Sequence, residues 1–173
     1  MDIKIEMDID VEQASLAQAP IVAAILREAA AWAERRHGRL WIESELDAAH
    51  IRAEIERGEF FLVRCTGEYA ATLRYQHVDE LFWPDETGPD SAYVHRLAVR
   101  RQYAGCGLAA AMLQWAARRA RAEGRLFLRL DTDITRPKLR CLYEGCGFRP
   151  HSERKVGPYH VMRYELRLDG IER

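Results

Sequence analysis

The chain has 173 residues, enough for one domain with a sizeable core, and we expect a single domain over residues 1–173. Its formal net charge of −1 gives no indication of nucleic acid or a membrane surface as a partner. No apolar run approaches the ~20 residues of a membrane span, and the N-terminus lacks the continuous apolar core of a signal peptide. We therefore expect a cytoplasmic protein that binds neither membrane nor nucleic acid.

The first third of the chain predicts a strand and two helices. Apolar and polar residues alternate over 3–11, which is typical of a half-buried strand. Helical spacing of apolar residues follows over 20–36 and ends before a glycine. Ser44 and Asp47 have the spacing of a capping box that opens a second helix, which Gly58 ends.

An antiparallel hairpin is predicted next, with strands over 60–65 and 69–78 around a turn at 66–68. The loop 79–90 that follows contains five acidic residues and no basic residue. Such a loop either attracts a cation or forms a solvated face.

The stretch 93–107 combines a short apolar strand with a glycine-containing loop, and a helix follows from Leu108. The first amides of a helix lack partners within the helix, and the helix dipole adds partial positive charge there. Glycines allow the backbone to come close to a ligand, and Arg100 and Arg101 add full charges. This order predicts a cradle for a pyrophosphate, with an ordinary tight turn as the alternative.

Beyond that helix, the pattern predicts a strand over 126–130 and a short helix over 137–144 that two glycines end. A last hairpin turns at 156–159 and finishes with a strand over 161–168. No repeat, linker or low-complexity segment interrupts the chain.

The chain contains four cysteines, Cys65, Cys106, Cys141 and Cys146. No pair has Cys-x-x-Cys spacing and no histidine completes a zinc pattern, so we expect free thiols and no metal ion. Cys106 lies between two glycines, where it is either a small loop residue or a thiol that can react.

Two motifs link these elements to a known family. Residues 102–107 match Arg/Gln-x-x-Gly-x-Gly/Ala and follow Leu-x-Val at Leu97 and Val99, while residues 142–148 resemble Leu-Tyr-x-x-x-Gly-Phe. The chain strongly resembles the GNAT superfamily of N-acetyltransferases over nearly its whole length. The resemblance implies an α/β (α+β) fold, with a central mixed twisted sheet of about seven strands and about four helices in the order β-α-α-β-β-β-α-β-α-β-β.

The resemblance also implies acetyl-coenzyme A as the acyl donor. In the family the loop holds the pyrophosphate, the fourth and fifth strands splay apart, and the pantetheine pairs with the fourth strand, here residues 97–99. The amide of Val99, or of its neighbour, is then placed to polarise the thioester carbonyl. The residues expected at the coenzyme are Leu97, Ala98, Val99, Arg101, Gln102, Tyr103, Ala104, Gly105, Cys106, Gly107, Leu108, Arg136 and Lys138.

Arg136 departs from the family pattern, which often has an asparagine seven residues before the motif tyrosine. Arginine has donors but no acceptor, so it cannot make every bond of an asparagine. Arg136 is instead expected to contact a phosphate, together with Lys138.

Tyr143, the tyrosine of the second motif, is the candidate general acid. The resemblance implies that its hydroxyl points at the coenzyme sulfur. A phenol of pKa ~10 protonates a thiolate of pKa ~8–9 with modest driving force, so its position matters more than its acidity. The alternative is a packing residue whose hydroxyl is bonded elsewhere.

His95 is the candidate general base. Residues 93–99 resemble the His-x-His-x-Leu-x-Val of the arylalkylamine subgroup, with the second histidine kept and the first replaced by Tyr93. A histidine of pKa ~6.5 suits base catalysis at neutral pH, whereas the alternative is a strand histidine with satisfied hydrogen bonds. Glu80 is the second candidate base, if its loop folds over the site.

The sequence thus predicts an acetyl-coenzyme A-dependent N-acetyltransferase that acts on the primary amine of a small molecule or an amino-acid-like acceptor. A non-catalytic module that senses acyl-coenzyme A and an enzyme that acetylates a protein or peptide are the alternatives. The acidic loop would attract a cationic amine, and Trp41, Phe82 and Trp83 would wall an acceptor pocket or pack against the first helices. The acceptor, the length of the acyl group and a homodimer stay open.

Overall fold

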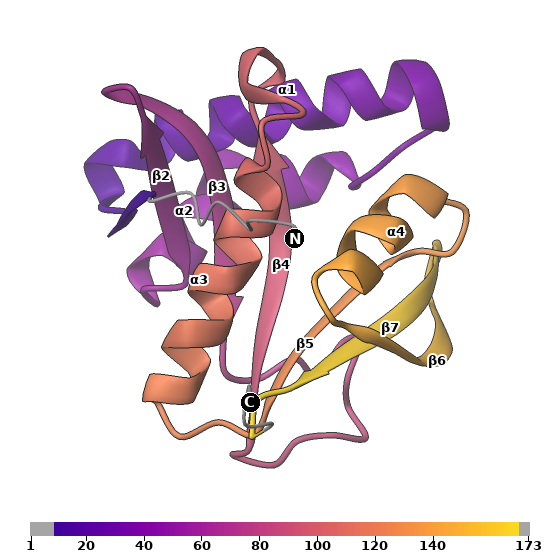
Figure 1. Ribbon diagram of the computed structural model, residues 1–173. Helices are drawn as coiled ribbons and strands as arrows, with labels where there is room; N and C mark the ends of the chain where they lie inside the picture. Colours follow the sequence, from indigo (N-terminus) through magenta and orange to yellow (C-terminus); the bar gives the residue numbers. More distant parts are fainter. Residues whose placement is uncertain (1–8, 170–173) are drawn as a thin grey trace, which may run out of the picture. The chain divides into compact units, whose positions relative to one another are not determined.

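The computed structural model describes residues 9–169, which form a mixed sheet of seven strands and four α-helices (Figure 1). The strand order is β1-β2-β3-β4-β5-β7-β6; β4 and β5 are parallel, and the β1–β2, β2–β3, β5–β7 and β6–β7 pairs are antiparallel. This architecture confirms the predicted fold class. The strands are β1 Asp10–Gln13, β2 Phe60–Cys65, β3 Glu68–Gln76, β4 Ser91–Val99, β5 Phe127–Asp133, β6 Arg149–Val156 and β7 Tyr159–Arg167. The helices are α1 Ala19–His37, α2 Ala48–Glu56, α3 Leu108–Ala122 and α4 Pro137–Gly145.

Most predicted elements are confirmed, with differences at their ends. Residues 1–8 lie outside the described part, so of the strand predicted over 3–11 only the end is seen, where β1 begins at Asp10. Strand β5 continues to Asp133, beyond the apolar run over 126–130 that predicted it. The prediction ended too early because it followed apolar residues alone, and the second half of the strand contains polar residues.

The start of α2 differs from the prediction. A 3-10 turn precedes the helix, and Asp47 is itself the N-cap, with its carboxylate accepting the Ala49 N–H at 3.2 Å. The predicted capping box of Ser44 and Asp47 is therefore wrong. Aspartate is as good an N-cap as serine, so the spacing alone does not locate the first turn.

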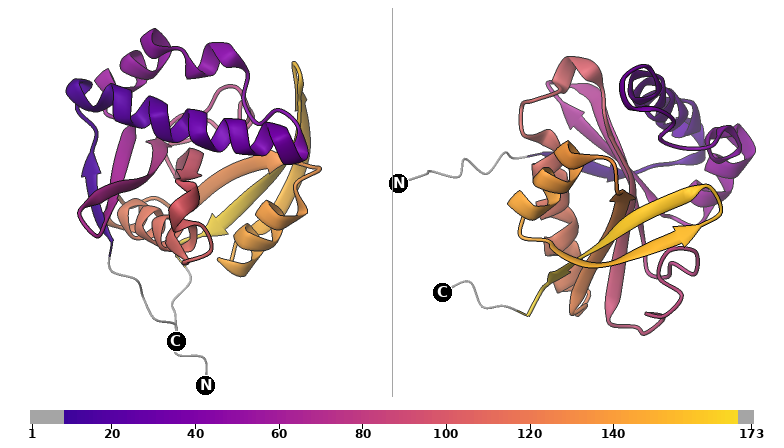
Figure 2. Two further views of the ribbon diagram at one scale, coloured as in Figure 1. Left: turned by 90° about the horizontal axis from the view of Figure 1, so that it is seen from above. Right: turned by 90° about the vertical axis from the view of Figure 1, so that its right-hand side faces the viewer.

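The chain groups into two compact units. The first contains the described residues up to Arg74 together with Arg96–Met112. In this unit α1 and α2 lie side by side (Figure 2), and Ile25 of α1, Ile51 of α2 and Phe60 of β2 are fully buried in one core. Full burial of each such side chain contributes roughly 1.5–3 kcal/mol, so this core holds the two helices in position.

The second unit contains Tyr75–His95 and the described residues from Leu113 onward. Strand β7 pairs with β5 and β6, and α4 lies beside β6 (Figure 1). Tyr164 of β7 is fully buried and packs on Tyr143 of α4, with 5.9 Å between the ring centroids. This contact restrains the orientation of the Tyr143 ring.

Strand β4 is irregular at Arg96, whose backbone is left-handed with φ of 49°. This conformation costs a residue with a side chain about 1–2 kcal/mol. The Arg96 guanidinium lies 2.8 Å from the buried Glu54 carboxylate of α2, which Arg74 also contacts at 2.8 Å. Breaking a buried pair of this kind costs about 3–5 kcal/mol, so the contact with α2 holds the irregular backbone in place.

The ladder between β4 and β5 is short. It pairs Ser91–Tyr93 with Phe127–Arg129, whereas β4 continues to Val99 and β5 to Asp133. His95 is thus the second residue of β4 beyond the last pair with β5, and the left-handed residue follows it directly.

None of the described helices has the length and hydropathy needed to span a membrane. All four cysteines are free thiols, and Cys106 is exposed in its loop, with its S–H donating to the Tyr103 carbonyl at 2.8 Å. A single domain over residues 1–173 and a cytoplasmic location stay predictions.

Candidate active site

The glycine loop turns sharply before α3. A 3-10 turn, Arg101–Tyr103, opens it, with the Tyr103 amide donating to the Arg100 carbonyl at 2.9 Å. Gly105 and Gly107 follow with φ of 78° and 85°, a region that side chains disfavour. The two glycines therefore let the chain reverse within a few residues and enter the helix at Leu108.

The amides at the end of the loop face no protein acceptor. In the described part of the chain, none of the N–H groups of residues 105–110 donates a hydrogen bond, and a Cβ added to Gly105 would meet no atom within 4 Å. A row of such amides at a helix N-terminus is the arrangement that binds phosphates elsewhere. The loop has the geometry that the predicted pyrophosphate cradle needs, and its contacts with a coenzyme stay a prediction.

Arginines at the start of the loop are held by Glu28 of α1. The Arg100 guanidinium contacts the Glu28 carboxylate and the Tyr69 carbonyl, each at 3.0 Å, so its charge is already paired within the protein. The Arg101 amide donates to Glu28 at 2.9 Å, and the Arg101 guanidinium stacks 3.9 Å from the Trp32 ring centroid. These contacts differ from the expectation that both charges stand beside a phosphate.

Glu68 of β3 anchors two further side chains of the loop. It accepts hydrogen bonds from the Gln102 amide at 3.2 Å and from the Tyr103 hydroxyl at 3.0 Å. The side chains of the first half of the loop thus bind protein, while the amides of its second half have no acceptor among the described residues.

The other predicted coenzyme residues lie on β4 and α4. Ala98 is buried, and Leu97 and Val99 are half-buried on either side of it. Lys138 is exposed, whereas Arg136 is only 7% exposed and occupies the N-cap position of α4. The phosphate contact expected of Arg136 and Lys138 stays a prediction.

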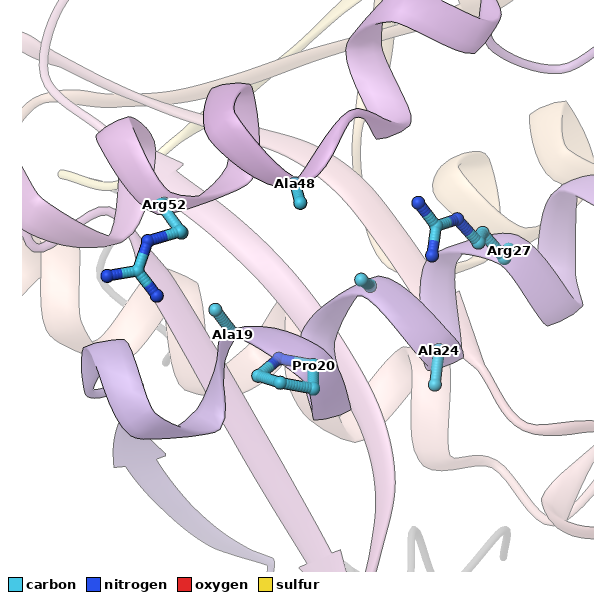
Figure 3. Close-up of a pocket in the computed structure, with 7 residues that line it drawn as sticks. Ala19, Pro20, Ala24, Arg27, Ala48 and Arg52 are labelled. Carbon is cyan, nitrogen blue, oxygen red and sulfur yellow. The ribbon is translucent and has the colours of Figure 1, made fainter.

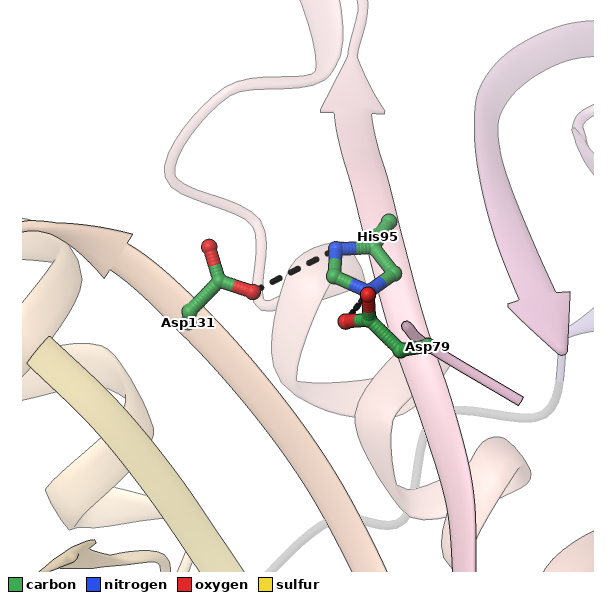
Figure 4. A group of neighbouring side chains, drawn as sticks. All are labelled: Asp79, His95 and Asp131. Atoms are coloured by element: carbon green, nitrogen blue, oxygen red, sulfur yellow. Dashed lines mark hydrogen bonds and ion pairs between the residues drawn. The ribbon is translucent and has the colours of Figure 1, made fainter. Parts of the chain in front are cut away.

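His95 is oriented by a buried aspartate. Its Nε2 lies 2.7 Å from Asp79 Oδ2 (Figure 4). The other carboxylate oxygen of Asp79 accepts hydrogen bonds from the amides of Leu81 and Phe82 at 3.1 and 3.0 Å. Burial alone would raise the pKa of Asp79, but the charge and hydrogen bond of His95 and the two amides outweigh it and lower that pKa. An ionised carboxylate only accepts, so His95 donates from Nε2, which leaves Nδ1 as its basic nitrogen when the ring is neutral.

Asp131 of β5 faces that second nitrogen. Its Oδ2 lies 3.5 Å from His95 Nδ1, and its side chain is 9% exposed (Figure 4). The oxygen and nitrogen atoms of Asp79, His95 and Asp131 lie within 4.8 Å of one another, a spacing that would also suit a metal ion. We call these three residues the aspartate–histidine cluster.

Sequence reasoning missed Asp79 and Asp131. Strand register would have found Asp131, because Tyr93 pairs with Arg129 and the residues two positions on are His95 and Asp131. Asp79 had no comparable indication, since it is one of five acidic residues in its loop and lies 16 positions before His95.

Tyr143 is buried at 7% exposure, in ring contact with Phe148 and Tyr164. Burial, and then the charge of Asp131, raise its pKa, so the phenol is held in its protonated form. Its hydroxyl donates to no side chain or carbonyl among residues 9–169. The ring packs as the alternative predicts, whereas the hydroxyl has no such partner in the described part of the chain; the role of Tyr143 as the acid stays a prediction.

Arginines clamp the acidic loop onto β5 and β7. Arg163 binds both carboxylate oxygens of Asp85 at 2.6 and 3.0 Å, which lowers the pKa of Asp85 to about 2. Arg129 contacts Glu86 at 3.1 Å. These carboxylates are neutralised by arginines of the same unit, whereas Glu80, the second candidate base, is exposed.

The three aromatic residues proposed for an acceptor pocket have different surroundings. Trp41 packs against the core of the first unit. Trp83 is fully buried, and the Arg129 and Arg163 guanidiniums lie 5.0 and 4.7 Å from its ring centroid. Phe82 flanks the cluster, with its ring centroid 5.9 Å from that of His95. Of the three, Phe82 is the one in contact with a candidate catalytic residue.

A shallow apolar hollow lies between α1 and α2 (Figure 3). It is lined by Ala19, Pro20, Ala23, Ala24, Arg27, Ala48 and Arg52. None of the predicted catalytic or coenzyme-binding residues lines this hollow, so it is not part of the candidate active site.

Comparisons with known proteins show the family of this chain. The sequence model of the acetyltransferase (GNAT) family matches residues 24–148. An uncharacterised N-acetyltransferase of Bacillus subtilis (strain 168), YesJ, is 29% identical over 151 residues, which cover 84% of this chain and 83% of the relative.

Solved structures share the fold at lower identity. A GNAT-family acetyltransferase of Listeria monocytogenes aligns with a TM-score of 0.73 at 22% identity, over 91% of this chain and 95% of that one. The aminoglycoside acetyltransferase AAC(6')-Ib, solved with paromomycin and acetyl-coenzyme A, aligns with a TM-score of 0.76 at 12% identity, over 93% and 94% of the two chains.

Proposed function

The chain belongs to the acetyltransferase (GNAT) family, and on that premise we propose that it transfers an acetyl group from acetyl-coenzyme A to the primary amine of a small molecule or an amino-acid-like acceptor. The transfer is direct, with the amine attacking the thioester carbonyl and no acyl-enzyme intermediate. Three parts of the chain support the proposal: a loop for phosphates, a strand for the thioester arm and a cluster of acid–base side chains.

The glycine loop binds the coenzyme in this proposal. The amides of residues 105–110 carry the partial positive charge of a helix N-terminus and would hold the pyrophosphate. Residues 97–99 of β4 would pair with the pantetheine, and the Val99 amide or its neighbour would polarise the carbonyl. AAC(6')-Ib, which shares the fold, was solved with acetyl-coenzyme A.

The chemistry needs a base for the amine and an acid for the thiolate. His95 Nδ1 takes one proton from the acceptor, whose nitrogen lone pair then attacks the thioester carbon. A C–N bond forms, the C–S bond breaks, and the Tyr143 hydroxyl gives its proton to the leaving thiolate. The acylated nitrogen then gives a second proton to the tyrosinate, which restores the phenol. An ammonium acceptor therefore yields an amide, free coenzyme A and one released proton.

The observation that carries the proposal is the 2.7 Å hydrogen bond between His95 and Asp79. It holds the imidazole in one orientation and one tautomer, as a general base requires. The raised pKa keeps Tyr143 protonated but makes it a weaker acid, so transfer of its proton to the thiolate would depend on its position. A module that only senses acyl-coenzyme A needs neither an oriented base nor a protonated phenol beside it.

Thiol release from acetyl-coenzyme A tests the proposal. The purified protein is assayed against primary amines, amino acids and peptides, and each acetylated product is identified by mass spectrometry. We expect turnover with at least one class of small amine. Tight binding of acetyl-coenzyme A without turnover would favour the sensor, and turnover confined to peptides would favour protein or peptide acetylation.

A further inference from the structure

Arg96 occupies a backbone position that glycine normally takes. Its φ of 49° is left-handed, and among residues 9–169 it is one of two non-glycine residues with a positive φ. The other, Thr66, lies in the turn between β2 and β3, where such values are common. Arg96 instead lies inside β4, with residues 97–99 following it in the strand. Left-handed residues inside strands are usually glycines at bulges, and strained backbone of this kind gathers at functional sites.

The side chain of Arg96 is anchored on α2. Its guanidinium is 6% exposed and lies 2.8 Å from Oε2 of Glu54, whose side chain is 2% exposed. The other oxygen of Glu54 lies 2.8 Å from Arg74 and 3.1 Å from His50. Glu54 is therefore held by two residues besides Arg96, which makes it a fixed point for the Arg96 side chain.

Stability alone does not account for the buried charge of Glu54. This residue lies on α2 between the buried Ile51 and Ile55, on a face that packs into the core. An apolar side chain could serve that core equally well, because the desolvation of buried ions offsets much of their attraction. A buried ion pair can, however, select one geometry, and the geometry in contact with Glu54 is the left-handed backbone of Arg96.

The residues directly after Arg96 are those that would hold the thioester arm. Because residues 97–99 complete β4, the φ of Arg96 sets the direction in which they run. We propose that Glu54 is a positioning residue for acetyl transfer, which acts through Arg96 to keep residues 97–99 in the direction that presents their amides to the thioester. This inference rests on the proposed function and goes beyond it by giving α2 a part in the reaction.

Two substitutions of Arg96 test the inference. Arg96→Gly and Arg96→Ala remove the same ion pair, but only glycine adopts a left-handed backbone without strain. Arg96→Gly should retain kcat/KM for the best amine within ~3-fold of wild type, whereas Arg96→Ala should fall ~5- to 30-fold below Arg96→Gly. Equal values in the two variants would overturn the inference, because a purely stabilising ion pair predicts the same loss in both.

A change of Glu54 tests whether this residue acts through Arg96. Glu54→Gln keeps the size of the side chain and removes its charge, so kcat/KM should fall ~5-fold or more. In the Arg96→Gly background the same change should cost less than ~2-fold, because residue 96 then keeps its conformation unaided. Equal losses in the two backgrounds would overturn the inference. If Glu54→Gln does not fold, the comparison of Arg96→Gly with Arg96→Ala still decides.

Glu59→Gln is the control for the network as a whole. Glu59 pairs with Arg57 and Arg74 at 3.1 and 2.7 Å, so the change removes a neighbouring charge of the same network. It should lower Tm but leave kcat/KM unchanged; a loss of kcat/KM as large as that of Glu54→Gln would contradict a specific role of Glu54.

Binding of the coenzyme separates failure of the inference from failure of the proposed function. No transfer to any amine by the wild type would remove the proposed function. The Kd for acetyl-coenzyme A, measured by calorimetric titration, would then still test the inference. A higher Kd for Arg96→Ala than for Arg96→Gly would support it, and equal values would overturn it.

Discussion

The glycine loop and the aspartate–histidine cluster present different parts of the chain to a ligand. In the loop, the amides of residues 105–110 have no acceptor among the described residues, while Glu28 and Glu68 hold the neighbouring side chains of Arg100 and Tyr103. In the cluster, the side chains of a loop residue, a β4 residue and a β5 residue meet, and the groups that would act on a ligand belong to side chains. One region depends on the path of the main chain and the other on the identity of side chains.

The two regions should therefore respond to opposite kinds of substitution. The loop tolerates many side chains but neither bulk nor negative charge at its glycines. The cluster tolerates no change of charge, even one that preserves shape. The predictions that follow use this difference, starting with the largest expected effect.

Gly105→Glu should abolish coenzyme binding. The change places a negative charge beside the proposed phosphates, and the repulsion together with the φ of 78° should weaken acetyl-coenzyme A ~100-fold or more. Calorimetric titration measures the loss, and circular dichroism checks the fold. Gly124→Glu is the matched control, since Gly124 has φ of 74° and open space around it. Unchanged affinity of the Gly105→Glu variant for acetyl-coenzyme A would contradict the proposed phosphate cradle.

Asp79→Asn should lower kcat/KM ~100-fold or more while acetyl-coenzyme A still binds, because the amide no longer holds the His95 tautomer by charge. Asp90→Asn, on the same loop and exposed, is the control.

The stability of Asp79→Asn should also depend on pH differently from that of the wild type. The lowered pKa of Asp79 means that its charge stabilises the folded state above pH ~4, and this contribution is lost as the pH falls further. The difference in Tm between wild type and variant should shrink from pH 7 to pH 3; a constant difference would contradict the buried charge.

Tyr143→Phe should reduce kcat ~10- to 100-fold and change KM little, because the hydroxyl is needed only when the thiolate leaves. Since the pKa of Tyr143 is raised, wild-type kcat should not fall through ionisation of this phenol below pH ~10. Tyr164→Phe removes the same atom from a neighbouring ring, whose hydroxyl instead donates to Glu144 at 2.8 Å. An unaltered rate in Tyr143→Phe would exclude it as the acid.

Arg163→Lys should have the smallest effect, a ~3- to 10-fold loss of kcat/KM. Lysine cannot donate two parallel hydrogen bonds to Asp85, so the loop that carries Asp79 should be held less firmly. The pKa of Asp85 is about 2, so the clamp stays ionised at neutral pH and weakens only as the pH falls from about 4 toward 2. Arg167→Lys alters a similar but exposed pair with Asp169 and should change activity less than twofold (roughly). Equal effects in the two variants would show that the clamp does not position the loop.

The fold and the position of the glycine loop could be predicted because the sequence patterns that indicate them lie within short stretches of the chain. Alternating and helical spacing located the elements, and the six residues 102–107 carry the loop motif without a gap. His95 and Tyr143 were found through motifs of the same contiguous kind. Asp79 and Asp131 were not, because only pairing between β4 and β5, and the folding of the acidic loop onto β7, bring them to His95. The arginines that clamp that loop are likewise distant in sequence, and this is why its charges looked unpaired.

The most direct measurement is acetyl transfer by His95→Gln beside its affinity for acetyl-coenzyme A. The account predicts that kcat/KM for the best amine falls ~100-fold or more while the Kd for acetyl-coenzyme A stays within about twofold of wild type. His160→Gln, which changes an exposed histidine paired with Glu153, should match wild type in both quantities. Transfer at the wild-type rate by His95→Gln would contradict the claim that this cluster deprotonates the acceptor.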